Sequence, residues 1–129
     1  MCRGVQIKQG CEIVCGIAGI LSDANQNITK VVNLMSTALH HRGPDGNDVW
    51  VSSLGDIGLA HTRLAILDLS DAGRQPMESK SQRYVMTFNG EIYNHLSIRQ
   101  ELENIKSIYW DGHSDTEVLL AAIEEWGFE

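Results

Sequence analysis

The sequence predicts an α+β fold in which helices lie against antiparallel sheets. Apolar residues recur at helical spacing over residues 28–41. Two strand-like runs, near 48–52 and 57–62, are separated by a turn at residues 54–56, as in a β-hairpin. Strands alternate with helices, but some of the strands pair as hairpins. A layered arrangement is therefore expected rather than a doubly wound parallel sheet.

Four further elements are predicted from shorter patterns. Residues 14–21 form a short apolar run, which is expected to be a buried strand. Residues 83–88 and 107–110 predict two more strands. Asn94 stands where it can cap a helix over residues 95–104.

The last helix has the clearest start signal in the chain. Ser114 followed three residues later by Glu117 is the capping-box pattern, in which each side chain satisfies a backbone N–H of the first turn. The apolar face expected to be buried consists of Leu119, Ala122, Ile123 and Trp126. A capped amphipathic helix is therefore predicted at the end of the chain.

Composition excludes several classes of function. The 129 residues fit one domain, and the net charge is −7. Nucleic acid and anionic membranes are not expected as partners, because both reward clusters of Lys and Arg. No apolar stretch reaches the length that spans a bilayer. A cytoplasmic protein is expected by default.

All three cysteines, Cys2, Cys11 and Cys15, stand close to the N-terminus. An odd count leaves at least one free thiol, and a disulfide scaffold is not expected. The spacings match no zinc-binding pattern, so no metal site is expected. Lys8 and Glu12 interrupt the first segment, which therefore does not resemble a signal peptide.

Five short motifs carry the chemistry, and together they resemble class II glutamine amidotransferases of the asparagine-synthetase kind. One such motif is weak evidence, whereas five in the family's order are strong. The resemblance implies the N-terminal-nucleophile hydrolase sandwich, in which helices lie outside two packed antiparallel sheets. The motifs are CGIAGI at 15–20, HRGPDG at 41–46, HTRLAI at 61–66, FNGEIYN at 88–94 and SDTE at 114–117.

Amide hydrolysis needs a nucleophile and a site for the oxyanion, and three residues are candidates. Cys15 supplies a thiol, which is a better nucleophile than a hydroxyl near neutral pH. The carboxamide of Asn89 and the backbone N–H of Gly90 suit an oxyanion hole. Read without the resemblance, the local sequence favours a buried structural cysteine at Cys15 and a type I′ hairpin turn at Asn89-Gly90.

Charged residues predict how a free amino acid is held at both ends. Arg63 lies among apolar residues and matches an α-carboxylate, although an internal salt bridge explains it too. Asp115 falls in the first turn of the last helix, where a carboxylate also complements the helix dipole. The resemblance implies that Asp115 and Glu91 receive the substrate ammonium. It also implies that Ile66 and Leu67 contribute backbone groups.

The expected activity is that of a glutaminase, with glutamine as the substrate. The enzyme would pass through a cysteine thioester and release ammonia for an asparagine-synthetase-type amidation. No cofactor is expected for this step, and ATP and Mg are expected only in a synthetase domain. A cysteine–histidine protease is the weaker alternative, because the residues around Cys15 do not resemble papain or caspase sites.

Two departures from the family pattern lead to a different hypothesis. Residues 1–14 are expected to be an N-terminal extension, with residues 15–129 the N-terminal portion of the amidotransferase domain. Family members expose the nucleophilic cysteine as the first residue, whose α-amine acts as base. Val14 stands where the family has its initiator methionine. The alternative function is that of a catalytically silent, glutamine-binding fragment. An incomplete sheet would leave an unprotected edge, which favours a homo-oligomer.

Overall fold

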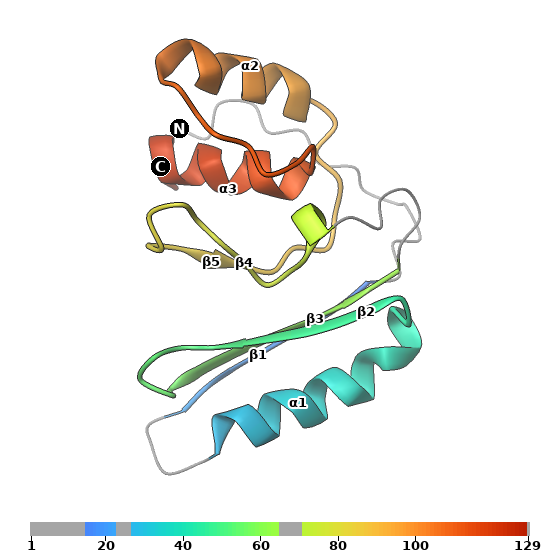
Figure 1. Ribbon diagram of the computed structural model, residues 1–129. Coiled ribbons are helices and arrows are strands. Elements are labelled where there is room, and N and C mark those ends of the chain that lie inside the picture. The colour runs from blue at the N-terminus through green and yellow to red at the C-terminus, as the bar shows by residue number, and fades with distance from the viewer. Residues whose placement is uncertain (1–14, 23–26, 65–70, 129) are drawn as a thin grey trace.

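A computed structural model describes residues 15–22, 27–64 and 71–128, and it confirms the α+β class (Figure 1). Helix α1 lies on one side of a three-stranded sheet, and a small two-stranded sheet lies on the other side. Helices α3 and α2 follow beyond the small sheet. The elements are β1 (Gly16–Leu21), α1 (Ile28–Leu39), β2 (Gly46–Val51), β3 (Ile57–Arg63), β4 (Met77–Glu78), β5 (Val85–Met86), α2 (His95–Ile105) and α3 (Asp115–Trp126), with 3-10 turns at His40–Arg42 and Asp71–Gly73.

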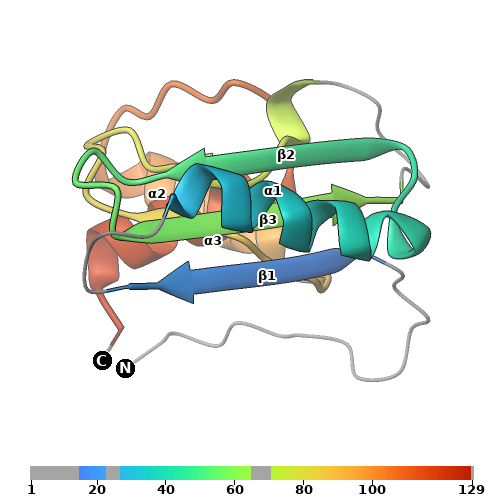
Figure 2. The ribbon, with the colours of Figure 1, turned by 90° about the horizontal axis from the view of Figure 1, so that it is seen from below.

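The larger sheet has the strand order β1-β3-β2, with both pairs antiparallel. Alternate residues of its strands point to opposite faces. The outer face, turned toward α1, is tightly packed, since Val32 and Ala60 are 0% exposed. A Cβ built on Gly58 would lie 2.9 Å from Cγ2 of Ile28, so glycine lets the helix approach the sheet closely. Figure 2 shows α1 running along the sheet above the central strand β3.

The inner face of the same sheet is turned toward β4 and β5, and it is only partly covered. Two polar contacts join the layers along β2. The Arg74 guanidinium pairs with the Asp48 carboxylate at 2.5 Å, and the Trp50 indole N–H donates to Glu78 Oε1 at 2.5 Å. We call these two contacts the polar seam. Toward β1, by contrast, Leu21 is 75% exposed.

The prediction of a fully buried strand at 14–21 was therefore wrong in part. Strand β1 forms, but Ile17 is 46% exposed and only alternate residues are covered. Among the described residues β1 pairs with β3 alone, so it is an edge strand. Its apolar run reflects a strand that has α1 on one face and an open second face.

A second core lies between α2 and α3. Its buried residues are Ile92, Ile98, Leu102, Val118 and Ala122. The predicted face of α3 was only partly right, because Val118 and Leu120 are buried while Leu119 and Ile123 are partly exposed. Helix α3 lies between the small sheet and α2, so it buries more than one side (Figure 1).

The start of α3 forms at the predicted residue, but by a different pattern of contacts. Ser114 Oγ accepts the N–H of Thr116 at 3.2 Å. The Glu117 carboxylate does not close the capping box. Its two oxygens instead accept the N–H groups of Asp111 and Gly112, at 2.7 and 3.1 Å. Glu117 therefore holds the loop that leads into the helix.

Three smaller predictions also need correction. Asn94 is the N-cap residue of α2, but its side chain makes no capping hydrogen bond. The strand predicted over 83–88 is only Val85–Met86. Residues 107–110 are irregular, because Ile108 and Trp110 pack against the helical core instead of pairing with a strand.

Candidate active site

A cavity of about 490 Å³ gathers residues from four of the five motifs, and the motif at 41–46 contributes none of its lining. It lies between the start of β1, the end of β3, the segment after β5 and the N-terminus of α3. Six of the eight predicted site residues line it: Cys15, Arg63, Asn89, Gly90, Glu91 and Asp115. The other two, Ile66 and Leu67, lie outside the described residues.

Cys15 is a free, half-buried thiol immediately before β1. The residue after it is anchored, because Gly16 N–H donates to Thr62 Oγ1 at 3.1 Å. The Thr62 hydroxyl in turn donates to the carbonyl of Leu39 at 3.2 Å. A Cβ on Gly16 would lie 2.6 Å from Thr62 Oγ1, so only glycine fits at this position. The backbone that carries the thiol is therefore fixed to the central strand.

The Asn89-Gly90 pair lies beside Cys15 at the border of the cavity. Asn89 Nδ2 donates to the backbone carbonyl of Cys15 at 3.2 Å. The pair is no type I′ hairpin turn, because neither residue has a positive φ and the chain continues toward α2. A Cβ on Gly90 would lie 2.5 Å from Cζ of Phe88, so glycine lets the Phe88 ring pack closely against this backbone.

The charged residues lie at two borders of the same cavity. Arg63 ends β3 and is half-buried, and its guanidinium passes beside Gly73, where a Cβ would lie 3.4 Å from Nη2. Asp115 opens α3, and its Oδ2 accepts the N–H of Ile92 at 2.8 Å. That bond ties Asp115 to the segment that carries Glu91. One cation and two carboxylates therefore border one space.

His61 also lines the cavity, although the HTRLAI motif predicts no role for its histidine. It is 4% exposed, and its Nε2 has no hydrogen-bond partner among the residues that the structure describes. Burial lowers the pKa of His61, the Arg63 charge lowers it further, and the backbone of Phe88 and the Asp48 carboxylate oppose this shift. The imidazole is therefore held in its neutral form. In the sequence, the sole indication that His61 belongs to the site is its position two residues before Arg63.

Gln75 is a second cavity residue that the sequence did not indicate. It precedes Pro76 in a segment that reads only as a loop. Its burial and its two hydrogen bonds arise from tertiary contacts that no local pattern reveals.

The described part of the chain gives two further negative findings. It contains no group of three or more His, Cys, Asp or Glu residues placed to hold a metal ion. None of its helices has both the length and the apolar character that crossing a membrane requires.

Comparison with known proteins shows the family of the chain. Residues 14–129 match the family described as "Glutamine amidotransferase domain". The chain is 38% identical over 118 residues to an asparagine synthetase [glutamine-hydrolyzing] 1 of Arabidopsis thaliana, covering 90% of this chain and 19% of that protein. The chain therefore belongs to the glutamine amidotransferase family, and it resembles the domain found in asparagine synthetases.

Two other relatives give the same result. An asparagine synthetase of Asparagus officinalis is 40% identical over 116 residues, covering 88% of this chain and 19% of that protein. Asparagine synthetase 1 of Bacillus subtilis is 34% identical over 119 residues, covering 88% of this chain and 18% of that protein. The chain thus spans about a fifth of the length of these relatives.

Proposed function

We propose that this chain is the N-terminal portion of a glutaminase domain that uses Cys15 as its nucleophile. One observation carries the proposal. A thiol, a carboxamide, the backbone of a glycine and three charged side chains of suitable sign border one cavity of about 490 Å³. This set matches an amino acid with an amide side chain, because each group has a counterpart in the cavity.

In the proposed reaction the Cys15 sulfur attacks the carboxamide carbon of glutamine. The negative charge that develops on the amide oxygen is stabilised by Asn89 Nδ2 and the Gly90 N–H. The C–N bond breaks and ammonia leaves with the proton of the thiol, which gives a glutamyl thioester. Water then hydrolyses the thioester, releasing glutamate and restoring the thiol.

The base in this scheme is the α-amine of Cys15, as the family pattern implies. An α-amine has a pKa of about 7.7–8.0, which suits proton transfer near neutral pH. The Cys15 nitrogen is available for that role only when no residue precedes it. The proposal therefore includes an N-terminus at Cys15 in the active form.

The substrate is held at both charged ends. Arg63 is proposed to bind the α-carboxylate with its two-pronged guanidinium. Asp115 and Glu91 are proposed to bind the α-ammonium, with backbone groups of Ile66 and Leu67 also in contact. The bond from Ile92 N–H to Asp115 supports this, because it keeps the two carboxylate-bearing segments together.

For the whole protein we propose an N-terminal-nucleophile hydrolase sandwich joined to a synthetase domain. The described layers, α1, two sheets and then α3 and α2, support the sandwich. The curated relatives are about five times longer and are asparagine synthetases by name. Ammonia would pass to that domain, which would use ATP and Mg to amidate a carboxylate such as that of aspartate, in the cytoplasm.

A second candidate function is binding of glutamine without hydrolysis. The sequence itself supports it, because Val14 precedes Cys15 and makes its nitrogen an amide. An amide nitrogen is no base at neutral pH, and the same cavity would then hold glutamine without cleaving it.

One experiment separates the two functions. Two forms of the full-length protein are expressed, one with translation starting at position 14 so that the methionine is removed before Cys15, the other retaining residues 1–14. Glutamate release is measured, intact mass confirms each N-terminus, and Cys15→Ala is the control. Hydrolysis in the first form alone supports the proposal. Glutamine binding without hydrolysis in both forms supports the silent module.

A diazoketone analogue of glutamine tests the nucleophile directly. Peptide mass mapping should find the label on Cys15 in the first form. Labelling elsewhere, with Cys15 unmodified, would contradict the assignment.

A further inference from the structure

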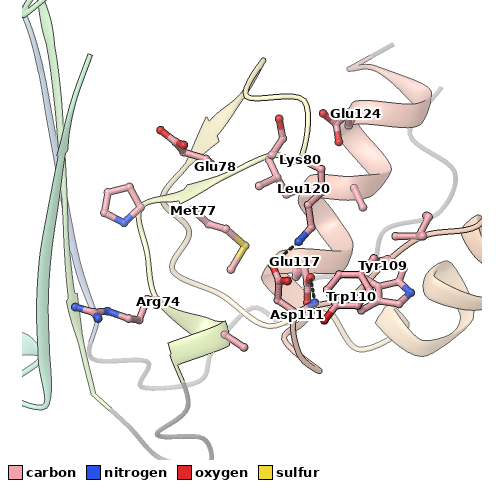
Figure 3. A pocket seen from close by; sticks show the side chains of 15 residues that line it. Arg74, Met77, Glu78, Lys80, Tyr109, Trp110, Asp111, Glu117, Leu120 and Glu124 are labelled. Atoms are coloured by element: carbon pink, nitrogen blue, oxygen red, sulfur yellow. Dashed lines mark hydrogen bonds and ion pairs between the residues drawn. The ribbon is translucent and has the colours of Figure 1, made fainter. Parts of the chain in front are cut away.

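Gln75 lies in the wall between two cavities. It is 8% exposed and stands between the 3-10 turn and β4. Gly73 and Gln75 border the cavity that holds Cys15, whereas Arg74 and Pro76 border a second cavity of about 440 Å³. Figure 3 shows that second cavity, with Met77 pointing toward α3 and Glu117. The segment thus turns alternate residues to the two sides.

Both ends of the Gln75 carboxamide are used. Its Oε1 accepts the backbone N–H of Phe88 at 2.5 Å. Its Nε2 donates to the hydroxyl oxygen of Thr116 at 3.2 Å, and that bond is buried. Because the first partner is a backbone N–H, the orientation of the amide is fixed by the contacts themselves.

The two partners adjoin the two halves of the proposed site. Phe88 immediately precedes the Asn89-Gly90 pair, and Thr116 immediately follows Asp115. A single side chain therefore connects the proposed oxyanion donors with a proposed substrate carboxylate. The hydrogen bond from Ile92 N–H to Asp115 joins the same two segments a second time.

We propose that Gln75 is a positioning residue for glutamine hydrolysis. It holds the Asn89-Gly90 donors and the Asp115 carboxylate in fixed positions relative to each other. The inference rests on the proposed function of the cavity. It adds a residue that touches neither the thiol nor, in this scheme, the substrate. Such a residue acts through geometry, because misplacing catalytic groups by about 1 Å can cost roughly 100-fold in rate.

Glutamine suits this task better than its nearest analogues. Asparagine is one methylene shorter and cannot reach both Phe88 and Thr116 from the same backbone. Glutamate keeps an acceptor for Phe88 but has no N–H to donate to Thr116. Methionine has similar length and shape and lacks both interactions, so Gln75→Met removes the bridge with little change in volume.

Kinetics of the full-length protein with Cys15 exposed provide the first test. Gln75→Met should lower kcat roughly 10- to 100-fold and raise KM, because the Asn89-Gly90 donors and the Asp115 carboxylate lose their fixed relative positions. Thr116→Val breaks only the α3 side, so it should mainly raise KM. Thr116→Ser keeps the hydroxyl and should restore the wild-type values. The double variant Gln75→Met/Thr116→Val should be no worse than Gln75→Met alone.

Hydrogen exchange gives a readout that does not depend on activity. Thr116→Val should accelerate amide exchange at residues 88–90, although the substitution lies on α3, and Thr116→Ser should not. A purely structural role would lower Tm in Gln75→Met while leaving kcat, KM and the Thr116→Ser comparison unaffected.

The outcomes separate the two proposals. If the wild-type protein releases no glutamate, the proposed function fails, and exchange alone decides whether Gln75 couples the segments. If the wild type is active and Gln75→Met matches it in kcat and KM, the inference is overturned. Unchanged exchange at 88–90 in both Gln75→Met and Thr116→Val overturns it as well.

Discussion

The two faces of the β1-β3-β2 sheet differ in what they contribute. The outer face packs against α1 through residues that are fully buried, such as Val32 and Ala60. The inner face carries His61 and Arg63 on β3, with Cys15 just before β1. It leaves Ile17 and Leu21 exposed to a degree that no packed core shows. One strand, β3, serves both faces by alternating its residues.

The difference shows how a small sheet can keep folding and chemistry apart. Apolar burial on the outer face supplies the free energy that holds the strands in place. The inner face can then carry polar groups and an open cavity, which contribute little to stability. Substitutions on the two faces should therefore have opposite profiles, with loss of stability on one and loss of activity on the other.

The largest effect is expected on the outer face. Ile28→Ala should lower the free energy of unfolding by about 2–5 kcal/mol, because it empties a buried site against Gly58. Ile17→Ala, on the inner face of β1, should cost less than about 1 kcal/mol because its side chain is nearly half exposed. Urea unfolding measures both. Equal losses would show that the inner face is packed as tightly as the outer.

The second-largest effect is expected for Asn89, in the cavity on the inner side of the sheet, and it should change activity but not stability. Asn89→Ala should lower kcat by about 100- to 1000-fold, because one proposed oxyanion donor is lost. Asn89 is exposed, so the free energy of unfolding should change by less than about 0.5 kcal/mol. Asn33→Ala, at an exposed position of α1, is the matched control for glutamate release. An active Asn89→Ala enzyme would remove Asn89 from the oxyanion site.

The third prediction concerns the proposed carboxylate clamp. Arg63→Lys should raise KM for glutamine roughly 10- to 100-fold, because an ammonium cannot make the two parallel contacts of a guanidinium. Arg83→Lys makes the same exchange at an exposed position and should leave KM unchanged. Isothermal titration with glutamine on a Cys15→Ala background checks the affinity. The same Kd in both variants would rule out the clamp.

The smallest effect concerns pH and His61. Because the folded state lowers the pKa of His61, the unfolded chain takes up this proton first as pH falls. The contribution of His61 to stability is therefore fully present above about pH 6.5 and declines below it. His61→Asn should flatten the stability curve between about pH 7.5 and 5.5. Urea midpoints at several pH values test this, and an unchanged slope would contradict it.

How much of this could be read from the sequence depended on the range of the interaction. The start of α3 at Ser114 was predictable, since an N-cap is local. The use of Glu117 was not, because its partners in the 111–112 loop are brought to it by tertiary packing. Motif order indicated the cavity and six of its residues. Gln75 escaped notice, because both of its bonds reach residues far along the chain.

The half-open inner face of β1 has the same explanation. An apolar run reports that side chains avoid water, but it does not report how many neighbours the fold provides. Ile17 and Leu21 fit a buried strand by composition, yet β1 is an edge strand among the described residues. Burial of such a strand depends on elements elsewhere in the chain.

The polar seam on β2 also has a mechanical consequence. The two sheets are fastened along β2 by Asp48 with Arg74 and Trp50 with Glu78, and at the cavity end by Asn89 with Cys15. These contacts lie along β2 and at the Cys15 end of β1, so the opposite corner of the sheet has none of them. In this molecule that corner carries Leu21. We therefore expect the two layers to separate most easily near Leu21, at the end of β1 that lies away from Cys15.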